Sequence, residues 1–334
     1  MKIAVIGAGR MGALRTEDLV KVGADVTVFN RNLEGAKTLA NKFKCHHDDL
    51  AHLKDNTFDG YVVATATDSH IGLLADLIPL GKPILCEKPI SLTVEETDSV
   101  IADCKKFGTQ IQVGFQRRFD PPISKAAKMV SSGDVGTLYS MHMYAHDHLP
   151  STLEFLEGSG SIYRDLHVHD FDLIRWITQS EISKVYATQA VREHKQYEKY
   201  NDADVSLISV TTASGVQIAI TGTRHNPVGH DVRIEIFGSK DSLAVGLNRK
   251  TPIHDIDGEM SFAEIRYQGF IERFRDAFAA ETEAFHQFVN GKISNPCPPE
   301  SAREALRVAI ACEESIRTGQ MCSLGDGYYR GDGG

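Results

Sequence analysis

The chain opens with Lys2-Ile3-Ala4-Val5-Ile6-Gly7-Ala8-Gly9-Arg10-Met11-Gly12, and this stretch carries the strongest fold signal in the sequence. Its first part is a short, mostly apolar run, and the residues that follow have the spacing of a helix. Three glycines, Gly7, Gly9 and Gly12, lie where the two patterns meet. A strand, a glycine-rich turn and a helix in this order are typical of the first βαβ unit of a parallel sheet.

The same alternation of strand and helix patterns continues to residue 120. β-Branched runs recur at residues 26–29, 61–63, 83–86 and 111–113. Between these runs we expect helices at residues 11–22, 33–43, 70–80 and 94–107. Strands that alternate with helices pair in parallel, so we predict an α/β domain with a Rossmann parallel sheet over residues 1–120.

The pattern changes after Pro121-Pro122. Strand patterns follow one another at residues 184–192, 204–213, 216–224, 231–237 and 241–245, with helical patterns at 123–131, 166–178, 270–290 and 300–318. Strands joined without intervening helices form antiparallel sheets. We therefore predict an α+β domain over residues 121–324 with a large, mainly antiparallel open sheet, followed by a flexible tail at 325–334.

Composition restricts the classes of partner. The 334 residues carry a formal net charge of -9 and lack a block rich in lysine and arginine, which argues against a nucleic-acid partner. The sequence has neither a signal-peptide pattern nor an apolar stretch of membrane-spanning length. Its 6 cysteines are scattered. We expect a soluble, cytoplasmic protein with reduced thiols and no membrane partner.

The glycine motif predicts a dinucleotide site. Gly7 would allow the tight turn, Gly9 would let a diphosphate approach the backbone, and Gly12 would permit close helix packing. The diphosphate would lie against the free N–H groups at the start of the following helix, beside Arg10 and Met11. The alternative is a glycine-rich turn in an α/β protein of another kind.

The residues after the second strand bear on the choice of dinucleotide. An acidic residue there binds the ribose 2′-hydroxyl of NAD and repels the 2′-phosphate of NADP. This sequence has Asn30-Arg31 instead, and a guanidinium is well suited to a phosphate. We expect NADP in preference to NAD. The alternative is that Arg31 is a solvated charge and Asn30 binds the diol of NAD.

Cys86-Glu87-Lys88-Pro89 ends the fourth strand pattern, at the edge where open α/β sheets bind ligands. A lysine there can polarise a hydroxyl or carbonyl oxygen, and Pro89 restricts the conformation of Lys88. Taken alone, this lysine could equally be a solvated charge.

A third cluster lies at residues 165–172. If the segment is one helix, Asp165, His169 and Asp172 share a face, and a histidine between carboxylates is a suitable general base. These groups could instead cap a helix and bind one another. The pairs His146-x-His148 and His167-x-His169 raise the question of a metal, but the second pair begins a helix, where such residues diverge. We expect no metal site.

These clusters, in this order, resemble the Gfo/Idh/MocA oxidoreductases over nearly the whole chain. The resemblance rests on the glycine loop, on Glu87-Lys88-Pro89, on residues 114–120, on Asp165-x-x-x-His169 and on residues 270–285. It implies hydride transfer between a secondary alcohol of a sugar or cyclitol and a nicotinamide. It also implies an open sheet that packs against another subunit, as a dimer or tetramer.

The resemblance further assigns roles to residues. Lys88 would hydrogen-bond the reacting oxygen, His169 would take the hydroxyl proton, and Asp165 would position the substrate. Thr65, His70 and Glu87 would lie at the cofactor, while Arg118 and His148 would lie at the substrate.

The sequence also departs from the family pattern. The run Thr65-Ala66-Thr67-Asp68-Ser69-His70 lacks a customary proline and asparagine, and His148 replaces an asparagine expected in inositol dehydrogenases. The substrate therefore stays open among inositols and sugars. Two other classes fit the fold: a NAD-assisted glycoside hydrolase, and a sugar-sensing regulator without catalysis. Lys88, Asp165 and His169 argue against the regulator.

Overall fold

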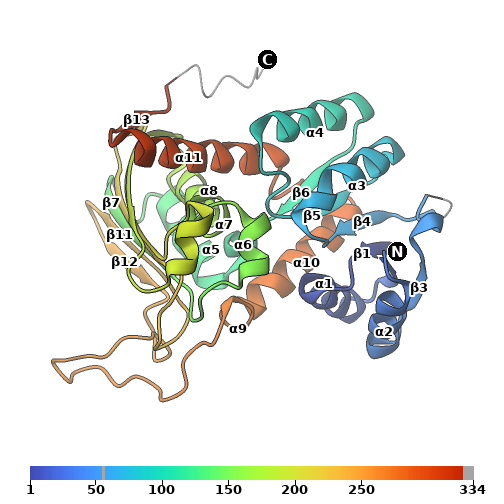
Figure 1. Ribbon diagram of the computed structural model, residues 1–334, viewed down its shortest axis with the longest axis horizontal. Coiled ribbons are helices and arrows are strands. Elements are labelled where there is room, and N and C mark those ends of the chain that lie inside the picture. Colours follow the sequence, from blue (N-terminus) through green and yellow to red (C-terminus); the bar gives the residue numbers. More distant parts are fainter. Residues whose placement is uncertain (55–56, 326–334) are drawn as a thin grey trace. The chain divides into compact units, whose positions relative to one another are not determined.

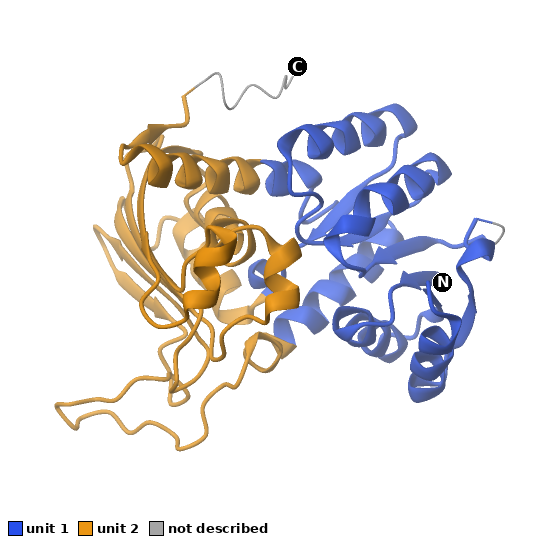
Figure 2. Ribbon diagram, viewed as in Figure 1, with its two compact units in different colours: residues 1–119, 276–303 blue, residues 120–275, 304–334 orange. Residues whose placement is uncertain are grey.

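The protein forms two compact units, and the computed structural model describes residues 1–54 and 57–325. The first unit contains Met1–Phe119 and Asp276–Arg303 (Figure 2). The second contains Asp120–Arg275 and the chain from Glu304 onward. The predicted tail lies outside the described residues, apart from Gly325.

The first unit is built on a 6-stranded parallel sheet (Figure 1). Its strands are β1 (Lys2–Ile6), β2 (Asp25–Asn30), β3 (His46–Asp49), β4 (Gly60–Val63), β5 (Ile84–Glu87) and β6 (Ile111–Gly114). Their order across the sheet is β3-β2-β1-β4-β5-β6. The predicted parallel sheet is therefore confirmed, and the carboxyl ends of its strands share one edge.

Helices and short 3₁₀ turns connect these strands. They are α1 (Arg10–Lys21), α2 (Leu33–Phe43), η1 (Leu50–His52), η2 (Thr67–Ser69), α3 (His70–Leu77), η3 (Ile78–Leu80) and α4 (Val94–Phe107), and a further 3₁₀ turn, η4 (Gln116–Phe119), follows β6. Thr93 caps the start of α4, because its Oγ1 accepts a hydrogen bond from the Glu96 amide at 3.3 Å, while its own amide donates to Ser91 Oγ at 3.0 Å. The helix ends at Gly108, whose left-handed backbone suits a glycine.

Helix α10 (Arg275–Val289) returns to the first unit, although the sequence placed this segment in the second domain. Phe285 and Phe288 belong to the same buried core as Ile3 and Val5 of β1. An apolar helical stripe predicts a buried face, but it does not tell which sheet that face meets. The chain continues to Arg303, which pairs with Asp98 of α4.

The second unit contains a 7-stranded mixed sheet. Its strands are β7 (Leu138–His146), β8 (Ile182–Ala190), β9 (Val205–Thr212), β10 (Gln217–Thr223), β11 (Asp231–Gly238), β12 (Ser242–Val245) and β13 (Cys322–Ser323). The order is β12-β11-β7-β10-β9-β8-β13, and β7 and β10 pair in parallel while the other neighbours are antiparallel. The predicted large, mainly antiparallel sheet is confirmed.

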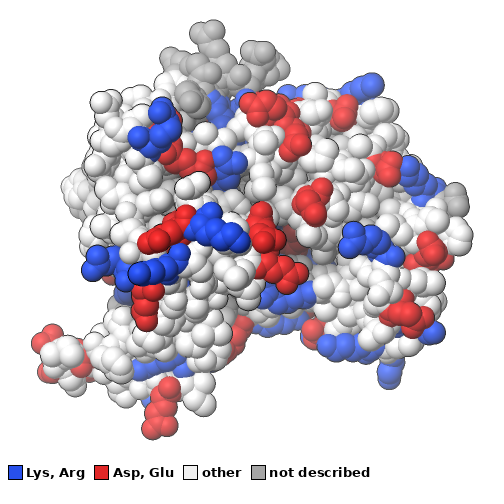
Figure 3. Space-filling model, in the orientation of Figure 1, with Lys and Arg blue, Asp and Glu red and all other residues white. Residues whose placement is uncertain are grey.

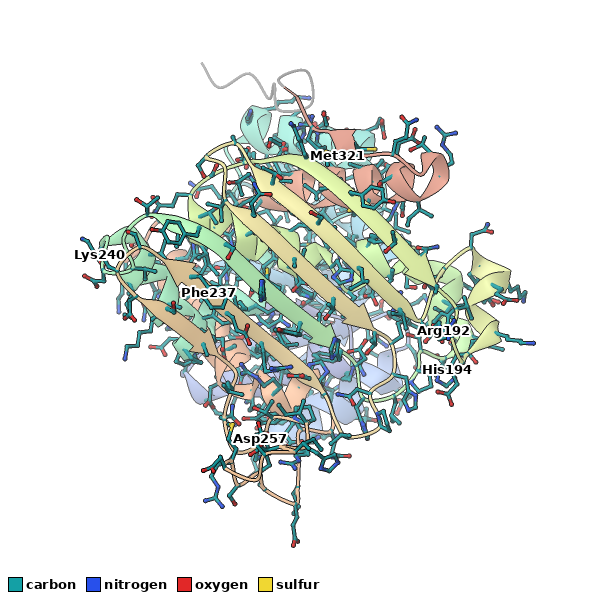
Figure 4. All side chains as sticks on the ribbon, turned by 90° about the vertical axis from the view of Figure 1, so that its left-hand side faces the viewer. Arg192, His194, Phe237, Lys240, Asp257 and Met321 are labelled. Atoms are coloured by element: carbon teal, nitrogen blue, oxygen red, sulfur yellow. The ribbon has the colours of Figure 1, made fainter. Side chains whose placement is uncertain are left out.

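Helices cover one face of this sheet and leave the other open. The helical segments after residue 120 are α5 (Pro121–Ser131), α6 (Leu153–Ser159), α7 (Ile162–Asp165), α8 (Val168–Thr178), η5 (Lys195–Tyr200), α9 (Phe270–Arg273) and α11 (Pro299–Thr318), and of these α5 and α8 contact strands of the sheet. Figure 4 views the strands from the side that no helix of the described residues covers. On that side Tyr186 and Leu207 are exposed, and alternate residues of the same strands are buried.

The surface carries both signs of charge. Acidic and basic side chains are interspersed over the face drawn in Figure 3. Within residues 1–54 and 57–325, no helix is both long and apolar enough to cross a membrane.

Candidate active site

The glycine loop joins β1 to α1 and has the geometry that a dinucleotide site requires. Gly7 has a φ of +115°, and a Cβ there would lie 2.5 Å from the carbonyl oxygen of Ala64. A Cβ on Gly12 would lie 1.9 Å from the carbonyl oxygen of Gly7. No described atom lies within 4 Å of the Cβ position of Gly9, which is the N-cap of α1 and makes no side-chain cap. The helix amides next to Gly9 therefore suit a diphosphate.

Asn30 is bound to the glycine loop, whereas Arg31 is not. The Asn30 side chain accepts a hydrogen bond from the Ala8 amide at 3.2 Å and donates to the Asn32 carbonyl at 3.0 Å. Arg31 is exposed, and no hydrogen bond or ion pair to it is found within the described part of the chain. Its guanidinium is thus available to an anion.

An open hollow lies beside α2, next to this loop. Its volume is about 340 Å³, and it is lined by Ala8, Glu34, Gly35, Thr38, Leu39 and Lys42. Ala8 also belongs to the glycine loop, so the hollow adjoins the expected diphosphate position. The lining residues include one basic side chain, Lys42, and one acidic side chain, Glu34.

Lys88 follows β5 directly and lies at the same sheet edge as the glycine loop. Its side chain is partly exposed, and the peptide bond to Pro89 is cis. Glu87 has a different environment, because it is buried and its Oε1 accepts from Arg15 Nε at 2.7 Å. One carboxylate oxygen of Glu87 is therefore bound to Arg15, and a contact between Glu87 and the cofactor stays a prediction.

Arg15 is the centre of a buried ionic network that the sequence did not reveal. It is fully buried, forms an ion pair with Glu281 and donates to Thr282 Oγ1 at 3.0 Å. Burial alone would lower the pKa of Arg15, but the charges of Glu281 and Glu87 raise it above its usual value. The network links α1, the end of β5 and α10.

Thr65 and His70 lie beyond the carboxyl end of β4. His70 is buried, and its ring nitrogens face the carbonyl oxygens of Pro89 and Thr65 at 2.9 and 3.2 Å. This ring ties the segment after β4 to the segment after β5. His70 can therefore support a cofactor site by holding Thr65 and Pro89 in place.

Arg118, predicted at the substrate, is nearly buried in η4. Its Nη1 donates to the carbonyl oxygen of Pro296 at 3.4 Å. A contact between Arg118 and a substrate stays a prediction.

In the second unit, Asp165 is held by a buried arginine. Arg224 Nη1 donates to Asp165 Oδ2 at 3.0 Å, and Nη2 donates to Asp202 Oδ2 at 2.9 Å. Arg224 and Asp202 are fully buried, whereas the side chain of Asp165 is 20% exposed. Burial would lower the pKa of Arg224, but Asp165 and Asp202 raise it. The guanidinium thus presents a partly exposed carboxylate in a fixed position.

His169 lies in the first turn of α8 and is 7% exposed. The helix expected at 166–178 is α8, which begins two residues later at Val168, whereas Asp165 is the last residue of the preceding helix α7. Asp165 and His169 therefore lie on two successive helices, and the prediction that they share the face of one helix was wrong. The two residues nevertheless lie only four positions apart in the sequence.

His148 lies just beyond β7 and is partly exposed. Its Nδ1 and the carbonyl oxygen of Asn226 are 3.1 Å apart. Because a carbonyl only accepts, Nδ1 is the donor, and the Nε2 of a neutral ring is left to accept a hydrogen bond. His148 Nε2 can therefore accept a hydrogen bond from a hydroxyl group.

The two His-x-His pairs do not converge on a shared ion. His167 is fully buried between Asp170 Oδ2 and Ser206 Oγ, at 2.8 and 2.7 Å from its ring nitrogens. Burial lowers the pKa of His146, although the charge of Asp231 opposes the shift. Within residues 1–54 and 57–325, neither pair forms part of a group of three close metal-ligand side chains.

Comparison with known proteins identifies the family. Residues 1–115 match the oxidoreductase family with an NAD-binding Rossmann fold, and residues 123–244 match the GFO/IDH/MocA C-terminal domain. The scyllo-inositol 2-dehydrogenase (NAD(+)) of Bacillus subtilis is 30% identical over 330 residues, which cover 97% of this chain and 96% of that protein.

Two further relatives agree. The inositol 2-dehydrogenase of Rhizobium meliloti is 30% identical, with 97% of this chain and 99% of that protein covered. The crystal structure of a myo-inositol dehydrogenase from Corynebacterium glutamicum has a TM-score of 0.89 and 30% identity, and 97% of this chain and 99% of that chain are covered. The chain therefore belongs to the Gfo/Idh/MocA family of oxidoreductases, with an NAD-binding Rossmann fold.

Proposed function

We propose that this protein is a NAD(P)-dependent dehydrogenase that oxidises a secondary ring hydroxyl of a cyclitol or sugar. The inositol dehydrogenases among its relatives support the class of substrate. The observation that carries the proposal is the environment of Asp165, a partly exposed carboxylate fixed by the buried Arg224 a few residues before His169. A fixed carboxylate four residues before a histidine is suited to binding an alcohol that the histidine would deprotonate.

The residues of the chain divide the chemistry among them. His169 takes the hydroxyl proton, Lys88 hydrogen-bonds the oxygen on which negative charge develops, and Asp165 positions the ring. When bound, a nicotinamide would supply the acceptor for the carbon-bound hydrogen as a hydride, so that the alcohol could be oxidised to a ketone. The amides of the first turn of α1, which follow Gly9, would face the diphosphate of that cofactor.

Substitution of Lys88 and His169 tests these roles. We expect Lys88→Ala and His169→Ala each to lower kcat by at least roughly 100-fold, because each removes a group that acts in proton transfer or charge stabilisation. Binding of the reduced cofactor, followed by its fluorescence, should stay within a few-fold of wild type.

The matched control is Lys105→Ala, which removes an exposed lysine from α4 and should leave kcat unchanged. Wild-type kcat in both Lys88→Ala and His169→Ala would refute the assignment.

We further propose that NADP is preferred over NAD. The exposed Arg31 and the neutral Asn30 support this preference, since they favour a 2′-phosphate. The description of the matched family names NAD, and so does that of the Bacillus subtilis relative, which argues for the alternative. Arg31→Ala should lower kcat/KM with NADP while leaving kcat/KM with NAD nearly constant. A wild-type enzyme with higher kcat/KM for NAD would overturn the proposed preference.

The protein is also proposed to be a homo-oligomer, a dimer or a tetramer, through the open face of the second sheet. Exposed Tyr186 and Leu207 on this face support a self-association surface. We place the protein in the cytoplasm, because all six of its cysteines are free thiols, as a reducing compartment would keep them.

A further inference from the structure

Three metal-ligand side chains meet at one end of the second sheet, on two separate loops. Glu193 and His194 follow β8, and His225 follows β10. His194 Nε2 lies 3.2 Å from His225 Nδ1, and Glu193 Oε2 lies 3.9 Å from the same Nδ1. All three ligand atoms lie within 4.8 Å of one another. Figure 4 shows His194 beside Arg192, beyond the strand ends.

The spacing of the imidazoles is that of two ligands on one ion. Nitrogens that each lie about 2.0–2.1 Å from a tetrahedral zinc ion are about 3.3–3.4 Å apart. The 3.2 Å between His194 Nε2 and His225 Nδ1 is close to this value. The rings meet at an interplanar angle of 77°, so their nitrogens can converge without stacking. Glu193 is exposed and can bring a carboxylate oxygen closer by a small side-chain rotation.

Asp204 holds the two loops in this arrangement. Its carboxylate accepts hydrogen bonds from the backbone amides of Arg192, Glu193 and His194, at 2.7, 2.8 and 2.9 Å. Its carbonyl oxygen accepts from the Arg224 amide at 2.9 Å, which places the neighbouring His225. These hydrogen bonds to Asp204 therefore hold the backbone of both loops in place.

We propose that Glu193, His194 and His225 bind a divalent transition-metal ion, with zinc as the best match. Two imidazoles and one carboxylate are a donor set that zinc accepts, and they leave a fourth position for water. The ion joins the loop after β8 to the loop after β10 next to Arg224. The site is formed entirely by residues of the second unit and does not depend on the dehydrogenase assignment.

Zinc binding to the full-length protein tests the site. The protein is first freed of metal with a chelator and then dialysed against Zn²⁺, and bound zinc is measured by elemental analysis. We expect His194→Ala and His225→Ala each to bind one equivalent less than wild type. Glu193→Gln, which alters an exposed side chain, should raise the dissociation constant by roughly tenfold or more.

Two controls keep the result specific. His254→Ala removes an exposed histidine elsewhere in the second unit, and His46→Ala removes an exposed histidine on β3, so both should retain the wild-type stoichiometry. Zinc should also raise the Tm of wild type and of the controls by more than that of His194→Ala or His225→Ala. Equal zinc stoichiometry in wild type, His194→Ala and His225→Ala would overturn the site, as would a wild type that binds no zinc.

Discussion

At the scale of single residues, the proposed active site combines side chains that lie far apart in the sequence. Lys88, Asp165 and His169 could be proposed as site residues because each belongs to a short motif. Arg224 could not, because it contacts Asp165 only through folding, and an arginine at the end of a strand pattern normally indicates a solvated charge. The same applies to the approach of His194 to His225. Sequence motifs can indicate groups that react, whereas a positioning residue is recognised only from its contacts in the folded structure.

Arg224 is expected to act as a positioning residue for Asp165. Arg224→Lys keeps the charge but loses the planar fork that binds Asp165 and Asp202 together. We expect kcat/KM to fall by roughly tenfold or more, with cofactor affinity nearly constant. Arg224→Met should in addition lower the free energy of unfolding by about 3–5 kcal/mol, because two carboxylates lose their counter-charge.

Asp202→Asn provides the comparison that separates stability from activity. It removes one carboxylate and leaves the pair between Arg224 and Asp165 in place. It should therefore lower the free energy of unfolding with a smaller effect on kcat/KM than Arg224→Lys. If kcat/KM simply followed stability across the three variants, Arg224 would be only structural.

At the scale of elements, regular patterns were predicted well and irregular ones were not. The helices α2 and α4 agree with the predicted bounds, since their apolar spacing and caps are clear. Strand β3 was missed because its sequence, His46-His47-Asp48-Asp49, is polar and lies at a sheet edge. The short helices α6 and α7 lack enough turns to show a period. The helix α10 was expected, but its place in the first unit required the structure.

The packing of α10 gives an element-scale prediction. Phe285 is fully buried in the core of the first unit, so Phe285→Ala should lower the free energy of unfolding by about 3–5 kcal/mol. Urea denaturation followed by circular dichroism measures this change. Phe107→Ala, at the exposed end of α4, should cost less than about 1 kcal/mol. Similar losses in the two variants would argue against a core role for α10.

At the scale of the whole molecule, the open sheet face predicts self-association. Leu207 is 54% exposed on this face, and a glutamate there would place charge on a surface expected to be buried between copies. Light scattering after size exclusion should give a dimer or tetramer for wild type and a smaller mass for Leu207→Glu. Phe107→Glu, in the first unit, should keep the wild-type mass. A monomeric wild type at all concentrations would contradict this surface assignment.

The central claim, a dehydrogenase for ring hydroxyls, is tested most directly by screening cyclitols and sugars with both NAD and NADP. Absorbance of the reduced nicotinamide reports the reaction. We predict reduction with at least one cyclitol or sugar, dependent on Lys88 and His169. Absence of reduced cofactor with every cyclitol and sugar would contradict the claim, and cleavage of a glycoside without net reduction would identify a hydrolase instead.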